Sequence, residues 1–376
     1  MRPLVPTLVR FGAGRFAEAP AAAAELGRRA FVVTSRRAME RLGRTAALLR
    51  GLRDEGVATE VFCDYRLSPT TDDVDRGAGR ARAFRADVVI GLGGGSAIDC
   101  AKAVAAIAPG TRPAADYLYG RAAPGDGTLP ILAIPTTSGS GSETNRSAIL
   151  SDAARPFKDG IRGDPLFPRC AVVDPSLMQS LDRTTTSVTG FDALAHAIES
   201  FVSPRARPDA DARALDAAEA IVRWLPVALE EPANPEARTA LARAATTMGF
   251  NLSTVGTCLP HRADKPICAL HPGIAHGQSL ALVYPAWARR IGHANQARFE
   301  RLAAILDPAT GGAAGFPAAV DSLLRRIGLT RRAAEFGLTE ADVPTLAANV
   351  AGDTTVDPVP AARDELPAFF EEVVGG

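Results

Sequence analysis

The first 180 residues alternate short apolar runs with helical patterns, and this alternation restricts the fold more than any other feature of the chain. The runs typical of strands lie at 8–11, 29–35, 57–62, 86–91, 129–134 and 171–174. Helical patterns connect them, as at 37–55 and 71–84. Strands that alternate with helices form a parallel sheet covered on both faces. We therefore expect an α/β domain with a mostly parallel sheet over residues 1–180.

Strand patterns stop near residue 180, where long Ala- and Leu-rich stretches with helical spacing begin. Prolines are expected to interrupt these stretches. They are Pro204, Pro232, Pro260, Pro266 and Pro285. The pattern predicts a second, all-helical domain over residues 181–376.

A glycine-rich turn follows the strand expected at 86–91. It reads Gly93-Gly94-Gly95-Ser96 and leads into a helical pattern. Glycines between a strand and a helix let the backbone approach an anion, which the amides of the new helix end can bind. The carboxyl end of a strand is also where open sheets bind ligands. The turn predicts a phosphate or pyrophosphate site, and the alternative is a tight turn without a ligand.

A second loop, 135–143, comes directly after the strand at 129–134. It is rich in hydroxyl groups and glycine, and includes Thr136 and Thr137. Such a loop offers many donors to phosphate or ribose oxygens. The alternative is a loop that is merely flexible.

Four of the five histidines lie between residues 190 and 277. Asp192 and His196 are four residues apart, so on a helix their side chains share one face. His261, His271 and His276 follow later in the chain. A carboxylate with several imidazoles is the ligand set of Fe(II) or Zn(II), whereas Mg²⁺ and Ca²⁺ prefer oxygen ligands. The alternative is a scatter of unrelated polar residues.

Charge and cysteine content restrict the partners and the compartment. Lys plus Arg and Asp plus Glu are each 42, so no overall charge attracts nucleic acid or an anionic membrane. The five cysteines form no closely spaced pair, which is typical of reduced thiols in a cytoplasmic protein. No signal-type segment or membrane-length apolar run occurs. We expect a cytoplasmic protein without nucleic-acid or membrane partners.

Four motifs occur together in one order. They are Gly-Gly-Gly-Ser-x-x-Asp-x-x-Lys, Pro-Thr-Thr-x-Gly-x-Gly-Ser-Glu, Asp-Ala-Leu-x-His-Ala-Ile-Glu, and a late His followed by His-Gly. In this the chain resembles the iron-containing (group III) alcohol dehydrogenases, over roughly residues 8–290. The resemblance implies an amino-terminal dinucleotide-binding domain, a helical metal-binding domain, NAD(P)H and one divalent metal. It also implies a small aldehyde or alcohol as substrate and a homo-oligomer, which we expect to be a dimer.

The resemblance assigns residues to both sites. The cofactor residues that it implies are Gly94, Gly95 and Ser96 at the pyrophosphate, with Asp99 of the same motif, and Thr136, Thr137, Asn145 and Lys158 near the ribose and nicotinamide. The metal ligands that it implies are Asp192, His196, His261 and His276.

The chain departs from the family in the later histidine segment. His261 and His276 are fifteen residues apart, where many relatives have fourteen. Many relatives also carry a histidine four residues after the first, thought to relay protons, and Lys265 stands there in this chain. His271 is the nearest substitute for that relay, or an alternative ligand in place of His261. We prefer His261, because it keeps close to the family spacing.

Two further features bear on specificity. Ser35 ends a strand where NAD-preferring relatives commonly carry Asp, and Arg36 and Arg37 follow it. Because a carboxylate there would repel a 2′-phosphate, we expect NADPH to be accepted. Arg262 follows His261 and would offer a bidentate fork to a carboxylate, phosphonate or phosphate on the substrate. The alternative is a solvated loop in which Asp264 pairs with a nearby cation.

Other functions on the same scaffold stay open. Maleylacetate reductases usually lack the metal-binding carboxylate, so Asp192 argues against them. Dehydroquinate synthase-like lyases bind NAD and a metal but consume no net NAD(P)H. From another class, the chain could be a catalytically silent nucleotide-binding protein, which the intact Asp192, His196 and His276 disfavour.

Overall fold

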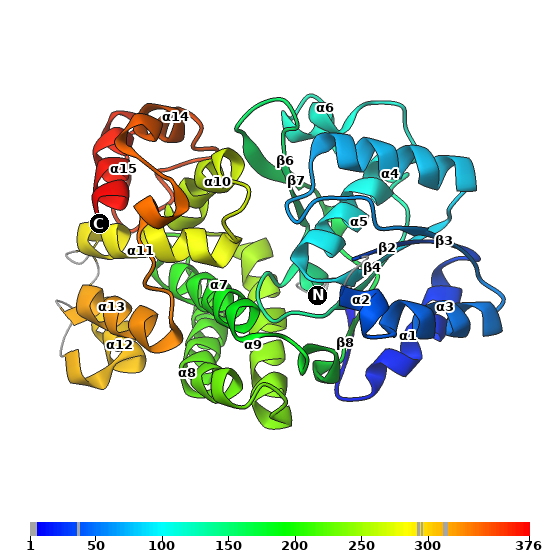
Figure 1. Ribbon diagram of the computed structural model, residues 1–376, viewed down its shortest axis with the longest axis horizontal. Coiled ribbons are helices and arrows are strands. Elements are labelled where there is room, and N and C mark those ends of the chain that lie inside the picture. Colours follow the sequence, from blue (N-terminus) through cyan, green and yellow to red (C-terminus); the bar gives the residue numbers. More distant parts are fainter. Residues whose placement is uncertain (1–5, 36–37, 292–293, 295, 311–314) are drawn as a thin grey trace. The chain divides into compact units, whose positions relative to one another are not determined.

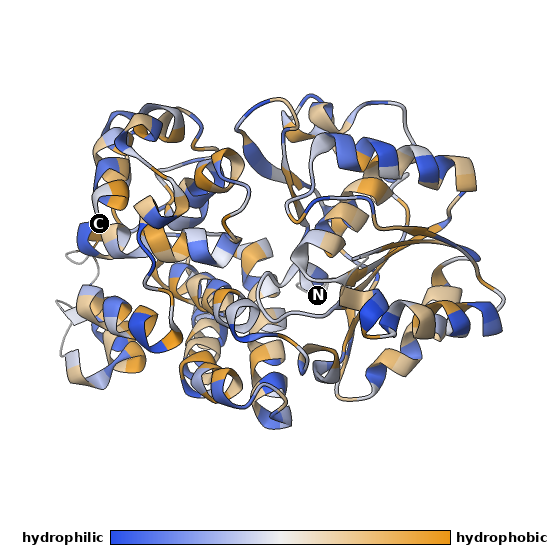
Figure 2. Cartoon of the chain, viewed as in Figure 1, coloured by the Kyte–Doolittle hydropathy of each residue, from blue (hydrophilic) through white to orange (hydrophobic). Residues whose placement is uncertain are grey.

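A six-stranded parallel sheet in the order β1-β8-β5-β4-β2-β3 forms the centre of the first part of the computed structural model (Figure 1). Its strands are β1 (Leu8–Phe11), β2 (Arg29–Thr34), β3 (Ala58–Phe62), β4 (Val88–Gly93), β5 (Ile131–Pro135) and β8 (Cys170–Val173). Strands β4 and β5 are buried on both faces, which is why their sequences are continuously apolar rather than alternating. Figure 2 shows the same strands as mostly hydrophobic ribbon.

Helices cover both faces of this sheet (Figure 1). The helices of this part are α1 (Ala19–Leu26), α2 (Ala38–Arg41), α3 (Arg44–Asp54), α4 (Thr71–Phe84), α5 (Gly95–Ile107) and α6 (Ala114–Leu118), of which α2 contacts α3 and α6 contacts α4. On one face, Ala23 of α1 and Leu48 of α3 share a core with Val32 and Ile90 of the sheet. On the other, α5 packs so closely on β4 that a β-carbon at Gly91 would lie 3.0 Å from Cα of Ile98. The predicted α/β fold is confirmed.

Two local predictions for this part were incomplete. The helix expected over 37–55 is divided into α2 and α3, because Gly43 adopts a left-handed backbone with φ +66°. The strands β6 (Ser147–Ser151) and β7 (Lys158–Arg162) form a separate two-stranded sheet that was not predicted. Both strands are short and carry polar residues, so their sequences give a weak strand signal.

The strand order reverses between β2 and β4. From β2 the chain adds β3 on one side, and it then returns to add β4, β5 and β8 on the other. Thr34 at the end of β2 lies opposite Leu92 near the end of β4. Ligands of open parallel sheets bind at such a reversal, outside the carboxyl ends of the strands.

The chain forms two compact units, residues 1–155 with 159–180, and residues 156–158 with 181–376. The structure describes residues 6–35, 38–291, 294, 296–310 and 315–376. Within these residues no helix combines the length and the apolar character needed to span a membrane.

In the described part of residues 181–376 the regular elements are all helical, as predicted. The α-helices are α7 (Arg183–Val202), α8 (Pro208–Glu230), α9 (Pro235–Thr254), α10 (Pro260–Leu270), α11 (His276–Ile291), α12 (Gln296–Leu306), α13 (Phe316–Ile327), α14 (Val343–Ala348) and α15 (Leu366–Gly375). Helix α7 is buried along most of its length and contacts α8, α9 and α11.

The expectation that Pro266 and Pro285 interrupt helices was wrong. Pro266 lies inside α10 and Pro285 inside α11. Each proline removes one backbone hydrogen bond from its helix. Neighbours such as Ile267 and Trp287 are fully buried, so tertiary packing maintains both helices despite the missing bond.

Candidate metal and cofactor sites

Helix α7 presents Asp192 and His196 on one face. Their spacing of four residues brings Nε2 of His196 to 3.6 Å from Oδ1 of Asp192. Both side chains are buried. The start of the helix is fixed by Asp182, whose carboxylate accepts a 2.6 Å hydrogen bond from the amide of Thr185. The sequence therefore sets this half of the site through ordinary helix geometry.

Helices α10 and α11 bring two more imidazoles to the same oxygen. His261 follows Pro260 at the start of α10, and His276 is the first residue of α11. Their Nε2 atoms lie 3.4 Å and 3.2 Å from Oδ1 of Asp192. The rings of His196 and His261 stack with centroids 4.4 Å apart. Ligand atoms of Asp192, His261 and His276 thus lie within 4.8 Å of one another, and His196 approaches the same oxygen of Asp192.

The donor atoms fit a divalent ion that prefers nitrogen with some oxygen. Two ligands of a tetrahedral shell with bonds of about 2.1 Å are about 3.4 Å apart. The separations of His276 and His261 from Oδ1 of Asp192, 3.2 and 3.4 Å, are close to that edge, and His196 is slightly farther away at 3.6 Å. One carboxylate and three imidazoles suit Fe(II) or Zn(II) better than Mg²⁺ or Ca²⁺.

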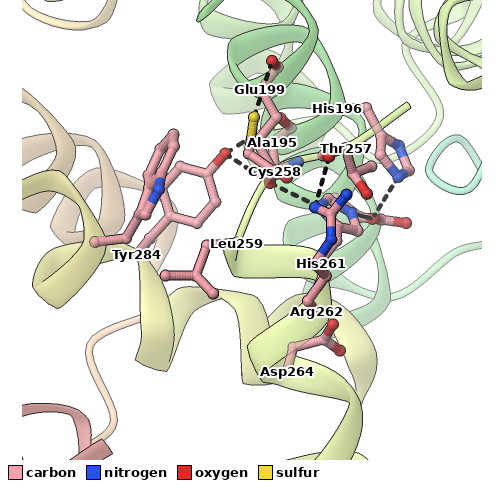
Figure 3. A network of polar contacts seen from close by, with 12 residues as sticks. Ala195, His196, Glu199, Thr257, Cys258, Leu259, His261, Arg262, Asp264 and Tyr284 are labelled. Atoms are coloured by element: carbon pink, nitrogen blue, oxygen red, sulfur yellow. Dashed lines mark hydrogen bonds and ion pairs between the residues drawn. The ribbon is translucent and has the colours of Figure 1, made fainter. Parts of the chain in front are cut away.

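Two buried carboxylates that the sequence analysis did not select as site residues contact these imidazoles. Oε1 of Glu199 lies 2.6 Å from Nδ1 of His261 (Figure 3). Oδ2 of Asp264 lies 2.6 Å from Nδ1 of His276. A signal for Glu199 was present, because it lies seven residues after Asp192 and so on the same face of α7. Asp264 was considered as a partner for a cation, but its contact is with a histidine.

The charges of the cluster shift the pKa values of its members in the protein without a metal ion. Burial opposes the charge on Asp192, but His196 and His276 hold the pKa of its carboxyl well below the ordinary value. Burial likewise disfavours protonated His261, but Glu199 and Asp192 raise its pKa to about 9. The pKa of His276 is raised well above its ordinary value against the effect of burial, by Asp264 and Asp192.

Of the three residues predicted to act near the substrate, His271 and Arg262 have a contact with a residue outside this cluster. Nε2 of His271 is 3.7 Å from Oδ2 of Asp342, so its ion-pair partner is not a member of the cluster. Lys265 is half-buried on α10. Nη1 of Arg262 donates a 2.6 Å hydrogen bond to the carbonyl of Thr257 (Figure 3).

The glycine turn leads from β4 into α5, as expected. Gly94 precedes the helix and Gly95 is its first residue. A β-carbon at Gly95 would lie 2.7 Å from the hydroxyl oxygen of Ser140, so no larger residue fits there without a shift. The hydroxyl of Ser96 donates to the carbonyl of Leu67. The turn therefore has the close packing and free helix end that an anion site requires.

The second loop is fixed to α5 by buried polar contacts. Asp99 accepts hydrogen bonds from the hydroxyl of Ser142 and, at 3.1 Å, from the amide of Ile149. The fully buried Lys102 donates to the carbonyl and side-chain oxygens of Asn145 at 2.8 and 3.0 Å. Burial lowers the pKa of Lys102 to about 8. Asp99 and Asn145 thus have structural partners within this part of the protein.

Thr136 and Thr137 follow β5 beside the glycine turn. The amide of Thr136 donates a 2.9 Å hydrogen bond to the carbonyl of Gly93. The hydroxyl oxygen of Thr137 lies 3.2 Å from where a β-carbon of Gly94 would be. The two predicted loops therefore meet at the carboxyl ends of β4 and β5.

Two other predicted cofactor residues have distinct surroundings. The hydroxyl of Ser35 accepts a 3.4 Å hydrogen bond from the amide of Met39. Arg36 and Arg37, which the prediction named together with Ser35, lie outside the described residues. Lys158 is buried and belongs to the second unit. Together with His276 and against the effect of burial, it lowers the pKa of Asp264.

Comparisons with known proteins identify the family. Residues 6–175 match the iron-containing alcohol dehydrogenase family, and residues 186–374 match its carboxyl-terminal domain. The long-chain primary alcohol dehydrogenase AdhA of Thermoanaerobacter ethanolicus is 34% identical over 81% of this chain and 79% of its own length.

Solved structures agree with these matches. An alcohol dehydrogenase from an archaeon of a Red Sea brine pool superposes with a TM-score of 0.95 and 27% identity, over 99% of this chain and 98% of its own. A sulfoacetaldehyde reductase of Bifidobacterium kashiwanohense, solved with NAD⁺, has a TM-score of 0.86 and 31% identity, over 98% and 97%. The chain therefore belongs to the iron-containing alcohol dehydrogenase family and is an NAD-dependent alcohol oxidoreductase.

Proposed function

We propose that this protein interconverts a small aldehyde and its alcohol with NAD(P)H, at a single divalent ion bound by Asp192, His196, His261 and His276. The observation that carries the proposal is the position of Oδ1 of Asp192, which lies 3.2–3.6 Å from three imidazole Nε2 atoms. The separations and the donor types both suit a tetrahedral divalent site.

The residues of the chain have separate tasks in this proposal. Asp192 supplies the negative charge that anchors the ion, and the imidazoles supply neutral lone pairs. A bound ion provides Lewis acidity toward the substrate carbonyl, and the nicotinamide provides hydride. Burial of Asp192, His196 and His261 keeps water away from the ligand atoms, which strengthens every electrostatic interaction there.

The metal is Fe(II) or Zn(II) in this proposal, since imidazole suits both. The test is to purify the protein under anaerobic conditions, remove the metal with a chelator, and reload it with each ion separately. Metal content and the consumption of NADH and NADPH are then measured with a series of small aldehydes. One ion per chain and restored reduction support the proposal, whereas full activity of the metal-free protein contradicts it.

Cofactor binding is proposed at the amino end of α5, with Gly94, Gly95 and Ser96 at the pyrophosphate. Its support is the helix end and the absence of room for side chains at Gly95. The loop residues Thr136, Thr137 and Asn145, with Asp99 and Lys158, complete the proposed cofactor residues. Ser35 leaves the adenosine end without a carboxylate, and this supports the acceptance of NADPH beside NADH.

An anionic aldehyde is a second, finer candidate for the substrate. The solved relative named as a sulfoacetaldehyde reductase acts on such a compound by its name. Arg262, one residue after His261, is the proposed partner for the carboxylate, phosphonate or sulfonate group. Since its Nη1 already donates to Thr257, the remaining donors of the guanidinium would have to bind the substrate.

Other reactions on this scaffold are distinguished by one measurement. A dehydroquinate synthase-like lyase regenerates its NAD, so it shows no net consumption of NAD(P)H. A maleylacetate reductase-like enzyme would consume NAD(P)H but would not depend on Asp192. Equal activity of Asp192→Asn and the parent protein on maleylacetate would favour that alternative.

Proton delivery to the developing alkoxide needs a titratable group near the metal ligands. His271 and Lys265 are the proposed groups, because both belong to the segment that carries His261 and His276. His271→Ala and Lys265→Ala should slow turnover at saturating aldehyde without releasing the metal. A homodimer stays a prediction from the resemblance, and a cytoplasmic location stays a prediction from the cysteine content and the lack of a signal-type segment.

A further inference from the structure

Two fully buried carboxylates contact the proposed metal ligands but are not themselves among them. Glu199 and Asp264 are 0% exposed, and each lies 2.6 Å from the Nδ1 atom of a proposed ligand. A carboxylate accepts hydrogen bonds, so Nδ1 of His261 and of His276 must carry the hydrogen. The other ring nitrogen, Nε2, faces Asp192 in both cases and is the one that would offer its lone pair to a bound ion.

We propose that Glu199 and Asp264 are positioning residues that fix the tautomer and the direction of His261 and His276, and thereby set the metal affinity. The inference rests on the proposed metal site, and it adds which residues orient two of the proposed ligands. A histidine ligand whose second nitrogen donates to a carboxylate is oriented and made more basic, which typically changes affinity by 10–100-fold.

Glu199 is itself rigidly fixed. Its Oε2 accepts a 2.7 Å hydrogen bond from the amide of Cys258, and its Oε1 accepts a 3.2 Å bond from the hydroxyl of Tyr284 (Figure 3). The Tyr284 hydroxyl also lies 3.1 Å from the carbonyl of Ala195. Because Glu199 and Asp192 both belong to α7, one helix holds the ring of His261 at both nitrogens.

Asp264 contacts the ring of His276 as Glu199 contacts that of His261, but from helix α10. It lies three residues after His261 on α10, and its Oδ2 contacts His276 at the start of α11. The thiol of Cys268 lies 3.6 Å from the same oxygen. Helix α10 therefore carries one proposed ligand and also the group that orients the next one.

These contacts link into one alternating chain of carboxylates and imidazoles, Glu199, His261, Asp192, His276 and Asp264. Asp192 lies in the middle of this series, with Glu199 at one end and Asp264 at the other. If Glu199 and Asp264 only filled space in the core, the ring nitrogens of His261 and His276 would not all need to face carboxylate oxygens.

The test measures metal affinity directly, with Zn²⁺ as the probe and a fluorescent chelator as competitor, on the metal-stripped full-length protein. Glu199→Gln and Asp264→Asn keep the size of the side chain and remove the charge. We expect each to weaken Zn²⁺ binding by 10–100-fold while one ion per chain still binds at saturation. Matched controls are Glu219→Gln and Asp216→Asn, whose side chains are exposed on α8.

A second measurement needs no substitution. In protein labelled with ¹⁵N-histidine, long-range couplings in the Zn²⁺-loaded state report which ring nitrogen carries hydrogen. We expect the Nδ1–H form for His261 and His276, assigned through His261→Ala and His276→Ala. If Glu199→Gln or Asp264→Asn fails to fold, the histidine spectrum of the parent protein still tests the proposal.

The outcomes separate this inference from the proposed function. Parental Zn²⁺ affinity in both folded variants, or an Nε2–H form of either ring, overturns the inference and leaves the ligand set intact. Full Zn²⁺ binding by His276→Ala contradicts the ligand set itself. Weakened binding in Glu199→Gln and Asp264→Asn, with unchanged controls, supports the assignment.

Discussion

Gly277 packs so closely on helix α7 that a β-carbon at this position would lie 1.9 Å from the carbonyl oxygen of Val188. No side chain can be accommodated there unless the backbone moves. His276 directly precedes this contact and begins α11. The approach of α11 to α7 therefore fixes where the imidazole of His276 can reach.

Gly277→Ala should displace the start of α11 and reduce metal retention by His276. We expect a loss of stability of about 1–3 kcal/mol, typical of an overpacked site, together with a lower metal content. Thermal unfolding and metal analysis measure the two effects. The control is Gly273→Ala in the preceding loop, where a β-carbon would meet no atom within 4 Å. Equal metal content in the two variants would contradict the prediction.

Loss of a single proposed ligand should abolish metal retention. His196→Ala and His276→Ala leave an incomplete shell around an ion that needs roughly four ligands. Both variants should still bind NAD(H), measured by nicotinamide fluorescence, because the proposed pyrophosphate residues belong to the other unit. His271→Ala should keep its metal. The ligand assignment is wrong if His271→Ala loses metal while His261→Ala retains it.

Ser35→Asp should move cofactor preference toward NADH. A carboxylate there can accept a hydrogen bond from the adenosine ribose and repel a 2′-phosphate. We expect kcat/KM for NADPH to fall by about tenfold or more, which corresponds to about 1.4 kcal/mol. Steady-state kinetics with both cofactors measure the change. Strong discrimination against NADPH by the parent protein would already rule out the premise.

The stability of the protein should increase with pH in the alkaline range through Lys102. Its pKa is about 8 in the folded protein, against an ordinary value of 10.5, because of burial. Between these pH values the unfolded chain binds more protons, so the free energy of unfolding rises with pH. The contribution is about 3 kcal/mol at most, and is complete above pH 10.5.

Chemical unfolding of the parent protein and of Lys102→Met at pH 7.5, 9 and 10.5 measures this contribution. The difference in unfolding free energy between the two proteins should grow in favour of the parent over that range. A difference that stays constant with pH would show that Lys102 titrates at its ordinary value in the folded state.

Arg262→Ala distinguishes a substrate contact from a structural one. If the guanidinium binds an anionic aldehyde, kcat/KM for a charged aldehyde should fall by about one to two decades, and that for its uncharged analogue should not. Lysine at this position should restore part of the loss. Similar losses on both substrates would assign Arg262 to its hydrogen bond with Thr257 alone.

The fold was largely predictable because its signals are local. Continuous apolar runs indicated β4 and β5, and the capping residue Thr70 precedes a helix, α4, with the predicted bounds 71–84. The separate two-stranded sheet of β6 and β7 lacked such signals. The prediction that Pro266 and Pro285 interrupt helices was wrong because long-range packing outweighs the local preference of proline.

The candidate site was predictable in part for the same reason. Asp192 and His196 have helical spacing, and the resemblance supplied His261 and His276. Their metal-binding roles stay predictions, although the structure brings all four together. Asp264 contacts His276 across two helices, and no local pattern specifies that contact. Glu199 had a helical signal, but its partner His261 is distant in sequence.

The alternating chain of carboxylates and imidazoles has a consequence for the protein once its ion is lost. When no metal is present, the neighbouring carboxylates raise the pKa of both His261 and His276, which favours the protonated rings. Two protons carry the same charge as one divalent ion. Protons that replace the metal ion can therefore offset part of the carboxylate charge that its loss would leave in the buried cluster. Loading the metal-free protein with the ion should therefore release protons, which a pH indicator in weakly buffered solution would detect.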